Sequence, residues 1–273
     1  MKRRKLIHNF SKDNSETSNC NICGKLCKLS KDHVFPKGLL SFEDGAIDNL
    51  HFFQRQETSL SPKNKGVFFR TICGKCNNFL GGNYDQALID VVVSARKQLT
   101  HIQNLNAMSF MFPEYSVSLE ATPSNICRGV IGHLLSARIS FDGPMMDDMR
   151  NYVLNQDAVL PKKYHLYTWL FPKEEYSVSA ECCIADTQLQ HSTYDCYKVY
   201  PLAFLFADID WNMPGVVDLL TYPHGNSTTV KYDCLNHPHP DWPESGLNLP
   251  EGFFRLFGAN MYNALKYVRR QHL

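Results

Sequence analysis

Long hydrophobic runs are missing from this sequence. No stretch of the 273 residues approaches the roughly 18 consecutive apolar residues that span a bilayer. The first segment, MKRRKLIHNFSKDNSETSN, is basic but has no apolar region behind it, so it does not resemble a secretory signal. Because 44% of the residues are hydrophobic, the chain can still bury a substantial core. We therefore expect a soluble, globular, cytoplasmic protein.

The chain also lacks internal repeats, low-complexity tracts and a strong excess of one charge. The first absence argues against a repeat architecture, and only the polar stretch from Ser11 to Asn19 is expected to be a flexible lead-in. The net charge is only +1, but residues 1–100 hold 16 Lys and Arg against 9 Asp and Glu, and the remainder holds 12 against 18. A basic first part beside an acidic second part predicts that any polyanion is met by the first part.

Cysteine, by contrast, is plentiful, and its spacing predicts a metal site. In the reducing cytosol, ten cysteines are not expected to form a disulfide framework. Cys20 and Cys23 form one CxxC pair, and Cys73 and Cys76 form another. Two such pairs can present four thiolates to one structural Zn²⁺. Cys27 is a nearby spare ligand, and the other cysteines are expected to be core residues: Cys127, Cys182, Cys183, Cys196 and Cys234.

The pattern of apolar residues predicts an α+β protein in two parts. A knuckle, a hairpin and a helix from Asn77 to about Leu99 are expected in residues 1–100. Residues 101–273 are expected to form an α+β domain with a mainly antiparallel sheet. Its first helix covers NICRGVIGHLLSARI with Ser124 or Asn125 as the cap, and its strands cover EYSVSAECCIAD, DCYKVYPLAFLFADIDW and STTVKYDCL.

Three short segments between and after the cysteine pairs carry a family resemblance. They are DHVFP at residues 32–36, IDN at residues 47–49 and CNNFLGG at residues 76–82. With the two CxxC pairs, this order resembles the zinc-containing HNH endonucleases of ββα-metal fold, and the first two segments are also similar to the HNH domain of CRISPR effector nucleases. The resemblance covers roughly residues 18–100, and it implies an HNH-type nuclease domain there.

The resemblance implies a role for each of several polar residues. His33 would be the general base that activates water, a role that a histidine near neutral pKa can fill. Asp32 and Asn77 would hold a catalytic Mg²⁺ or Mn²⁺ through oxygen atoms. Asn49 would hold His33 in place without contacting the cation. The alternative is that Asp32 and His33 are only a cap or a surface feature.

The spacing leaves one ligand assignment open. The stretch from Asn49 to Cys73 is longer than is common in the family, and Asn64 within it also resembles the final Asn segment. We prefer Asn77 because the last ligand of the family lies on a helix after the second knuckle. Five basic residues are candidates for contacts with nucleic-acid phosphates, unless they are simply solvated charges: Lys37, Lys63, Lys65, Arg70 and Lys75.

The second part shows no motif with recognisable chemistry. His237, His239 and Asp241 lie together but between prolines, which favours an extended loop over a ligand cage, and Asp208 and Asp210 fit a strand end. We expect this part to read the target, to dimerise or to dock a partner.

The leading functional expectation is a metal-dependent DNA endonuclease. By family analogy, it would act in prokaryotic restriction or anti-phage defence, and RNA is not excluded as the substrate. One alternative is a non-catalytic zinc module that binds nucleic acid or protein. The other is a nuclease effector subunit that a sensor protein activates.

Overall fold

The computed structural model describes residues 9–10, 17–39, 45–48, 68–108, 115–138, 143–186, 188, 191–243, 253–255 and 262–269. Asn49, Lys63, Asn64 and Lys65 fall outside these ranges, so the predictions for them, and for the hairpin between residues 47 and 73, lie outside the described residues. No helix in the described ranges is long and apolar enough to cross a membrane.

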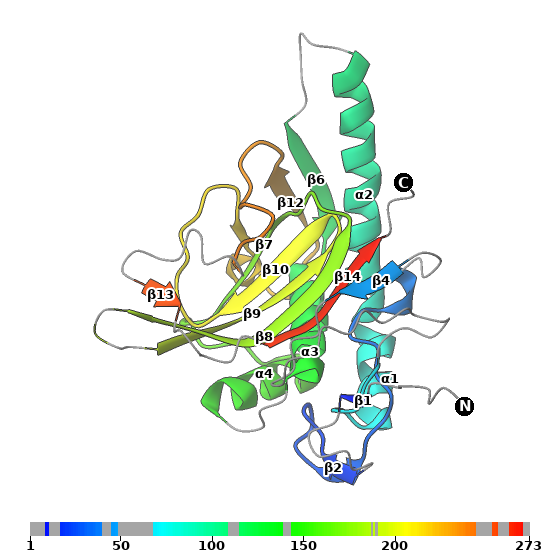
Figure 1. Cartoon of the computed structure of the whole chain (residues 1–273), viewed down its shortest axis with the longest axis vertical. Helices are drawn as coiled ribbons and strands as arrows, with labels where there is room; N and C mark the ends of the chain where they lie inside the picture. Colours follow the sequence, from blue (N-terminus) through cyan, green and yellow to red (C-terminus); the bar gives the residue numbers. More distant parts are fainter. Residues whose placement is uncertain are drawn as a thin grey trace, which may run out of the picture.

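The centre of the molecule is a curved, eight-stranded sheet whose strand pairs are all antiparallel (Figure 1). Its order is β11-β7-β10-β9-β8-β14-β4, with β13 also paired to β8. The predicted α+β class with a mainly antiparallel sheet is therefore confirmed. The strands are β4 (Gly45–Asp48), β7 (His165–Leu170), β8 (Glu175–Asp186), β9 (His191–Val199), β10 (Leu202–Ala207), β11 (Val217–Asp218), β13 (Phe253–Arg255) and β14 (Tyr262–Arg269).

Three two-stranded sheets complete the strand inventory of the described ranges. Antiparallel pairs join β2 to β3 and β6 to β12, whereas β1 and β5 pair in parallel. The strands are β1 (Asn9–Phe10), β2 (Thr17–Asn19), β3 (Leu26–Lys28), β5 (Phe68–Phe69), β6 (Ser116–Ala121) and β12 (Thr228–Asp233).

The described ranges contain four α-helices. They are α1 (Gly74–Asn83), α2 (Asp85–Met108), α3 (Pro123–Ala137) and α4 (Pro144–Leu154), and two short 3₁₀ helices, η1 (Lys37–Leu39) and η2 (Leu219–Thr221), accompany them. The helix expected from Asn77 to Leu99 is in fact α1 followed by α2, with the break at Tyr84, and α2 runs nine residues beyond Leu99 to Met108.

Helix α3 lies at the centre of the core. All of its residues except Asn125 are buried, and it contacts α1, α2, α4, β8 and β9. Its buried polar side chains, such as Arg128 and His133, have hydrogen-bond partners, so the helix can lie in the interior. The expected cap at Ser124 or Asn125 is wrong, because the helix already begins at Pro123, whose fixed φ suits the first helical position.

The core extends from the knuckle to the sheet. One buried cluster joins Cys20 and Ile22 of the first part to Val130 of α3 and Phe204 of β10. Helix α1 approaches α3 closely, because a Cβ atom added at Gly132 would lie 2.4 Å from Cδ2 of Leu80. The division of the chain near residue 100 stays a prediction, but the two parts pack tightly along α3.

Candidate functional site

The two cysteine pairs converge on one point. The Sγ atoms of Cys20, Cys23, Cys73 and Cys76 all lie within 4.8 Å of one another. Zn–S bonds of about 2.3 Å in a tetrahedron place the sulfurs about 3.8 Å apart, so the donor set and its spacing fit. Cys20, Cys73 and Cys76 are buried and Cys23 is half-buried. The cluster could therefore hold a structural metal such as zinc, and within the described ranges it does not include the spare Cys27.

Backbone geometry explains how distant knuckles meet. Gly24 has φ +69, a left-handed conformation that closes the first turn after Cys23. Antiparallel bridges pair Leu29 with Cys73 and Asp32 with Phe69, which returns the chain to the first knuckle after the long insertion. Cys73 then stands at the start of α1, and its backbone N–H donates to the Sγ atom of Cys20 over 3.3 Å.

The thiols of the cluster influence one another. A hydrogen bond with Cys76 lowers the pKa of Cys20, although burial opposes this shift, and the same hydrogen bond raises the pKa of Cys76. Burial raises the pKa of Cys27, and the neighbouring Cys73 and Cys20 raise it further, while its Sγ atom lies 3.2 Å from the carbonyl oxygen of Lys25. Since the thiolate is the form that binds metal, the cluster favours a ligand at Cys20 even before an ion arrives.

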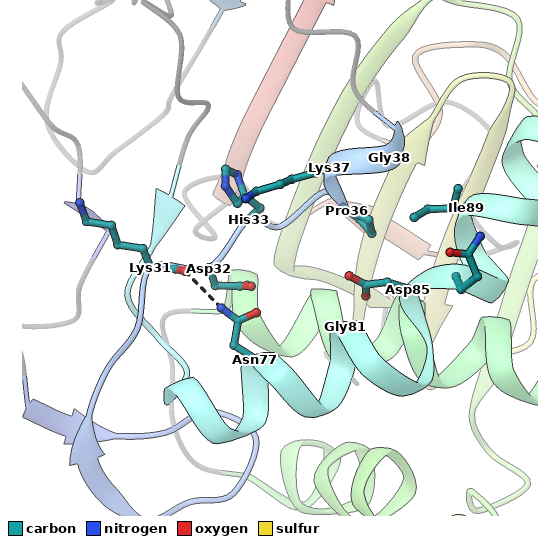
Figure 2. Close-up of a pocket in the computed structure, with 11 residues that line it drawn as sticks. Lys31, Asp32, His33, Pro36, Lys37, Gly38, Asn77, Gly81, Asp85 and Ile89 are labelled. Atoms are coloured by element: carbon teal, nitrogen blue, oxygen red, sulfur yellow. Dashed lines mark hydrogen bonds between the residues drawn. The ribbon is translucent and has the colours of Figure 1, made fainter.

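A polar cleft of about 490 Å³ opens beside α1 (Figure 2). Asp32, His33 and Asn77, which the sequence singled out separately, all line it. The segment at residues 29–32 pairs with residues 69–73, and α1 follows directly. The first segment supplies Asp32 and His33, its partner segment leads directly into α1, and α1 supplies Asn77.

The backbone of Asp32 is fixed by two hydrogen bonds, whereas one oxygen of its side chain lacks a hydrogen-bond partner among the described residues. Its N–H donates to the carbonyl oxygen of Phe69 and its carbonyl oxygen accepts from the N–H of Phe69, both over 2.9 Å. The residue is only 2% exposed, and its Oδ2 atom has no hydrogen-bond partner among the described residues. Burial raises the pKa of this carboxyl group, and the charge of His133 partly offsets the shift. Burying a carboxylate oxygen without a hydrogen-bond partner costs free energy.

His33 is half-buried at the same cleft. Burial lowers its pKa, and the positive charge of Lys37 lowers the pKa further. Both effects favour the neutral imidazole, which is the form that can accept a proton. Adjacent residues of a strand point to opposite faces, but the chain bends immediately after His33 and turns into η1, so that Asp32 and His33 both line the cleft.

The hydrogen bonds of Asn77 fix which of its side-chain atoms is the oxygen. Its Nδ2 atom donates to the carbonyl oxygen of Lys31 over 3.2 Å and to Oγ of Ser30 over 3.5 Å. Figure 2 shows the amide oxygen on the opposite side, toward Asp32. An amide oxygen and a carboxylate are thereby presented on the same wall of the cleft.

Two further residues of this site were missed by the sequence analysis. Asp85, at the start of α2, also lines the cleft and points into it (Figure 2). Its Oδ1 atom lies 3.0 Å from Nε2 of the buried His133 of α3. Burial alone lowers the pKa of His133, but the hydrogen bond and the charges of Asp85 and Asp32 raise it overall. The two carboxylates at the cleft are thus partly balanced from beneath by a histidine of α3.

Of the described basic residues that were candidates for phosphate contacts, only Lys37 lines the cleft. Lys37 lines the cleft with Lys31, which the sequence analysis did not select, and both are exposed. Lys75 is exposed on α1, and Arg70 is half-buried. A polyanion at this cleft would meet at least the two lysines.

The polar residues that drew notice in the second part have structural partners. Asp208 accepts from the N–H of Thr193 over 2.9 Å, and Asp210 accepts from the hydroxyl of Tyr167 over 2.9 Å. Asp241 forms an ion pair with Lys173 and lies 3.9 Å from His239. Among the described residues, no metal-binding group includes any of them.

Comparisons with known proteins do not assign a family. No protein-family model, no curated protein and no solved structure matches this chain. The case for a function therefore rests on the geometry of the cleft, the cysteine cluster and the sequence motifs.

Proposed function

We propose that the protein is a metal-dependent endonuclease of HNH type that hydrolyses phosphodiester bonds of DNA. The observation that carries the proposal is the cleft shared by Asp32, His33 and Asn77, in which one buried carboxylate oxygen has no hydrogen-bond partner in the part of the chain that the structure describes. The nearby cysteine cluster supports it, because a structural metal there would fix the segments that present these residues.

The donor set of the cleft fits a hard divalent cation. Asp32 and Asp85 offer carboxylate oxygens, and Asn77 offers an amide oxygen, which are the ligand types that Mg²⁺ and Mn²⁺ prefer. Asp32 and Asn77 would hold the cation, and Asp85 would contact it or one of its water molecules. The bound cation would neutralise the charge that develops on the phosphate and on the leaving oxygen.

The side chains of the chain itself would then carry the proton chemistry and the positioning. His33 accepts a proton from water as the water oxygen bonds to phosphorus. The P–O bond to the sugar breaks, and the departing oxygen takes a proton from solvent. Lys31 and Lys37 hold flanking phosphates, which fixes the substrate without selecting a sequence.

The setting of this activity rests on the family resemblance. Restriction or anti-phage defence is the biological role that it implies, and activation by a sensor protein is compatible with a large second part. A non-catalytic zinc module is the second candidate, favoured by the nearly complete burial of Asp32. In that case Asp32 and His33 would only shape the segment that precedes η1.

A plasmid-nicking assay distinguishes the two candidates. The protein is first treated with EDTA under conditions in which its zinc content, measured by metal analysis, is retained, and Mg²⁺ or Mn²⁺ is then added back. Wild type should nick DNA only after the addition. His33→Ala should lower the rate by about 10² to 10⁴, the usual contribution of a general base.

The matched control is His101→Ala, which removes an exposed histidine of α2 that does not line the cleft. It should nick at the rate of wild type. If His33→Ala nicks as fast as wild type and His101→Ala, the residue is structural and the nuclease proposal fails.

A further inference from the structure

A second cavity lies in the large part, away from the polar cleft. It has a volume of about 430 Å³, within the range of small-molecule sites, and it shares no lining residue with the cleft. It is bordered by the start of α3, the loop after α4, the start of β7 and η2. The tyrosines Tyr152, Tyr164 and Tyr222 contribute to its walls, together with Leu160 and Leu219.

One wall carries a histidine whose hydrogen bonding is set by an aspartate. Nδ1 of His165 lies 2.8 Å from Oδ2 of Asp218. The other oxygen of Asp218 accepts from the backbone N–H groups of Leu166, over 3.1 Å, and Leu220, over 3.0 Å. Because the carboxylate can only accept, Nδ1 of His165 carries the proton, and in the neutral ring Nε2 is left as an acceptor. The ring also stacks on Tyr167, with centroids 5.3 Å apart and planes 6° apart.

A second histidine on the cavity has the same tautomer, but its Nε2 atom rather than its Nδ1 atom is engaged by a partner. Nη2 of Arg128 lies 2.8 Å from Nε2 of His224. A guanidinium only donates, so this Nε2 accepts and the proton of His224 is on Nδ1. Arg128 is 1% exposed and also donates to the carbonyl oxygens of Asn155, Gln156 and Ala158. A buried arginine thus fixes both His224 and the loop that forms the rim.

The rim itself combines an apolar and a cationic side chain. Val159 is 77% exposed although it is apolar, and it lines the cavity. Lys162 lies three residues further along the same loop, is exposed and also lines the cavity. Aromatic walls, one acceptor, one donor and a cation at the mouth suit a planar heteroaromatic ring that carries an anionic group.

We propose that this cavity binds a free mononucleotide. Its base would lie against the tyrosine walls, with its polar edge hydrogen-bonded to His165 and His224, and its phosphate would lie near Lys162. Every nucleobase offers both donors and acceptors on its edges, so the tautomers of the two histidines suit the class without selecting one base. The proposal does not depend on nuclease activity.

Calorimetric titration of the full-length protein with AMP, GMP, CMP and UMP tests the proposal. At least one nucleotide should bind to wild type. His165→Phe, which keeps the ring stacked on Tyr167 but removes the acceptor, should weaken binding about fivefold to tenfold. Val159→Asp places a negative charge at the mouth of an exposed rim and should weaken binding by at least as much.

Two controls separate this cavity from other sites. Leu235→Asp makes the same kind of change at a residue that is 62% exposed and does not line the cavity, and Asp32→Asn alters only the polar cleft. Both should bind the nucleotide as wild type does. The proposal is overturned if none of the four nucleotides binds at millimolar concentration, or if Val159→Asp binds as tightly as Leu235→Asp. It is also overturned if inorganic phosphate competes as well as the nucleotide, because the aromatic walls would then contribute nothing.

Discussion

The cysteine cluster and the polar cleft are neighbours that differ in almost every physical respect. The cluster has four sulfur donors, which suit a closed, structural tetrahedral site. The cleft has oxygen donors, a carboxylate oxygen with no hydrogen-bond partner among the described residues, and a volume of about 490 Å³. A metal held by the cluster would stabilise the fold, whereas in the cleft burial raises the pKa of the Asp32 carboxyl group. This contrast predicts that substitutions in the two sites will separate stability from activity.

The largest effect is expected from Cys73→Ser. Removing one thiolate should release the metal and unfold the first part, because metal binding and folding are coupled in sites of this kind. Zinc content by metal analysis and thermal unfolding by circular dichroism measure both effects. Cys27→Ser is the control, since Cys27 lies outside the cluster, and it should retain zinc. If the wild-type protein is as stable without its metal as with it, the cysteine cluster does not stabilise the fold and the contrast between the two sites fails.

Asp32→Asn should have the opposite effect to Cys73→Ser: it should retain stability and lower activity. The amide removes a charge whose burial raises the pKa of the carboxyl group, so the melting temperature should stay the same or rise. The affinity for Mn²⁺, measured by calorimetry, should fall, and nicking should drop about 10²-fold with loss of cation-assisted charge stabilisation. A lower melting temperature with unchanged Mn²⁺ affinity would instead make Asp32 a structural residue.

Asn77→Ala should produce a smaller change that is specific to the cation. It removes one neutral oxygen ligand, so the Mg²⁺ concentration for half-maximal nicking should rise about tenfold, the equivalent of one hydrogen bond to a charged group. Asn64→Ala, tested in parallel, should leave that concentration unchanged. If Asn64→Ala raises the required Mg²⁺ concentration and Asn77→Ala does not, Asn64 is the ligand.

Lys37→Gln should have the smallest effect and should act on the substrate. Loss of one phosphate contact should weaken DNA binding a few-fold and reduce the slope of log affinity against log salt by about one. Fluorescence anisotropy at several salt concentrations measures the slope. Lys97→Gln, a change on α2 at a residue that does not line the cleft, is the matched control. Equal slopes for Lys37→Gln and wild type would exclude Lys37 from the phosphate contacts.

The sequence predicted the local features of the molecule well. The CxxC spacing located the cysteine cluster, and alternating apolar residues located β8 at the segment EYSVSAECCIAD and β12 within STTVKYDCL. It also selected three residues that the fold brings to one cleft. These features depend on short-range spacing, which a single sequence displays directly.

The missed features depend on long-range packing. Asp85 follows Asn77 by eight residues, a spacing that places both near the same face of the helix predicted there. This spacing was the one sequence feature that could have indicated Asp85 as a residue of the cleft. His133 carries no local signal, because only apolar residues and a glycine flank it directly and its partner lies 48 positions earlier. The end of α2 was placed too early because residues 100–106 are mostly polar, and an exposed helix can continue through such residues.

Helix α3 gives the two proposed sites a common support. Its first turn carries Ser124 at the nucleotide cavity, and His133 two and a half turns later lies beneath the polar cleft. Because nearly every residue between them is buried, the amide protons of this helix should exchange with deuterium only when the whole molecule opens. Hydrogen exchange along α3 therefore measures the global free energy of unfolding. If that exchange slowed on adding a nucleotide, Mn²⁺ or both, the change would report the binding free energy of each ligand on a single scale.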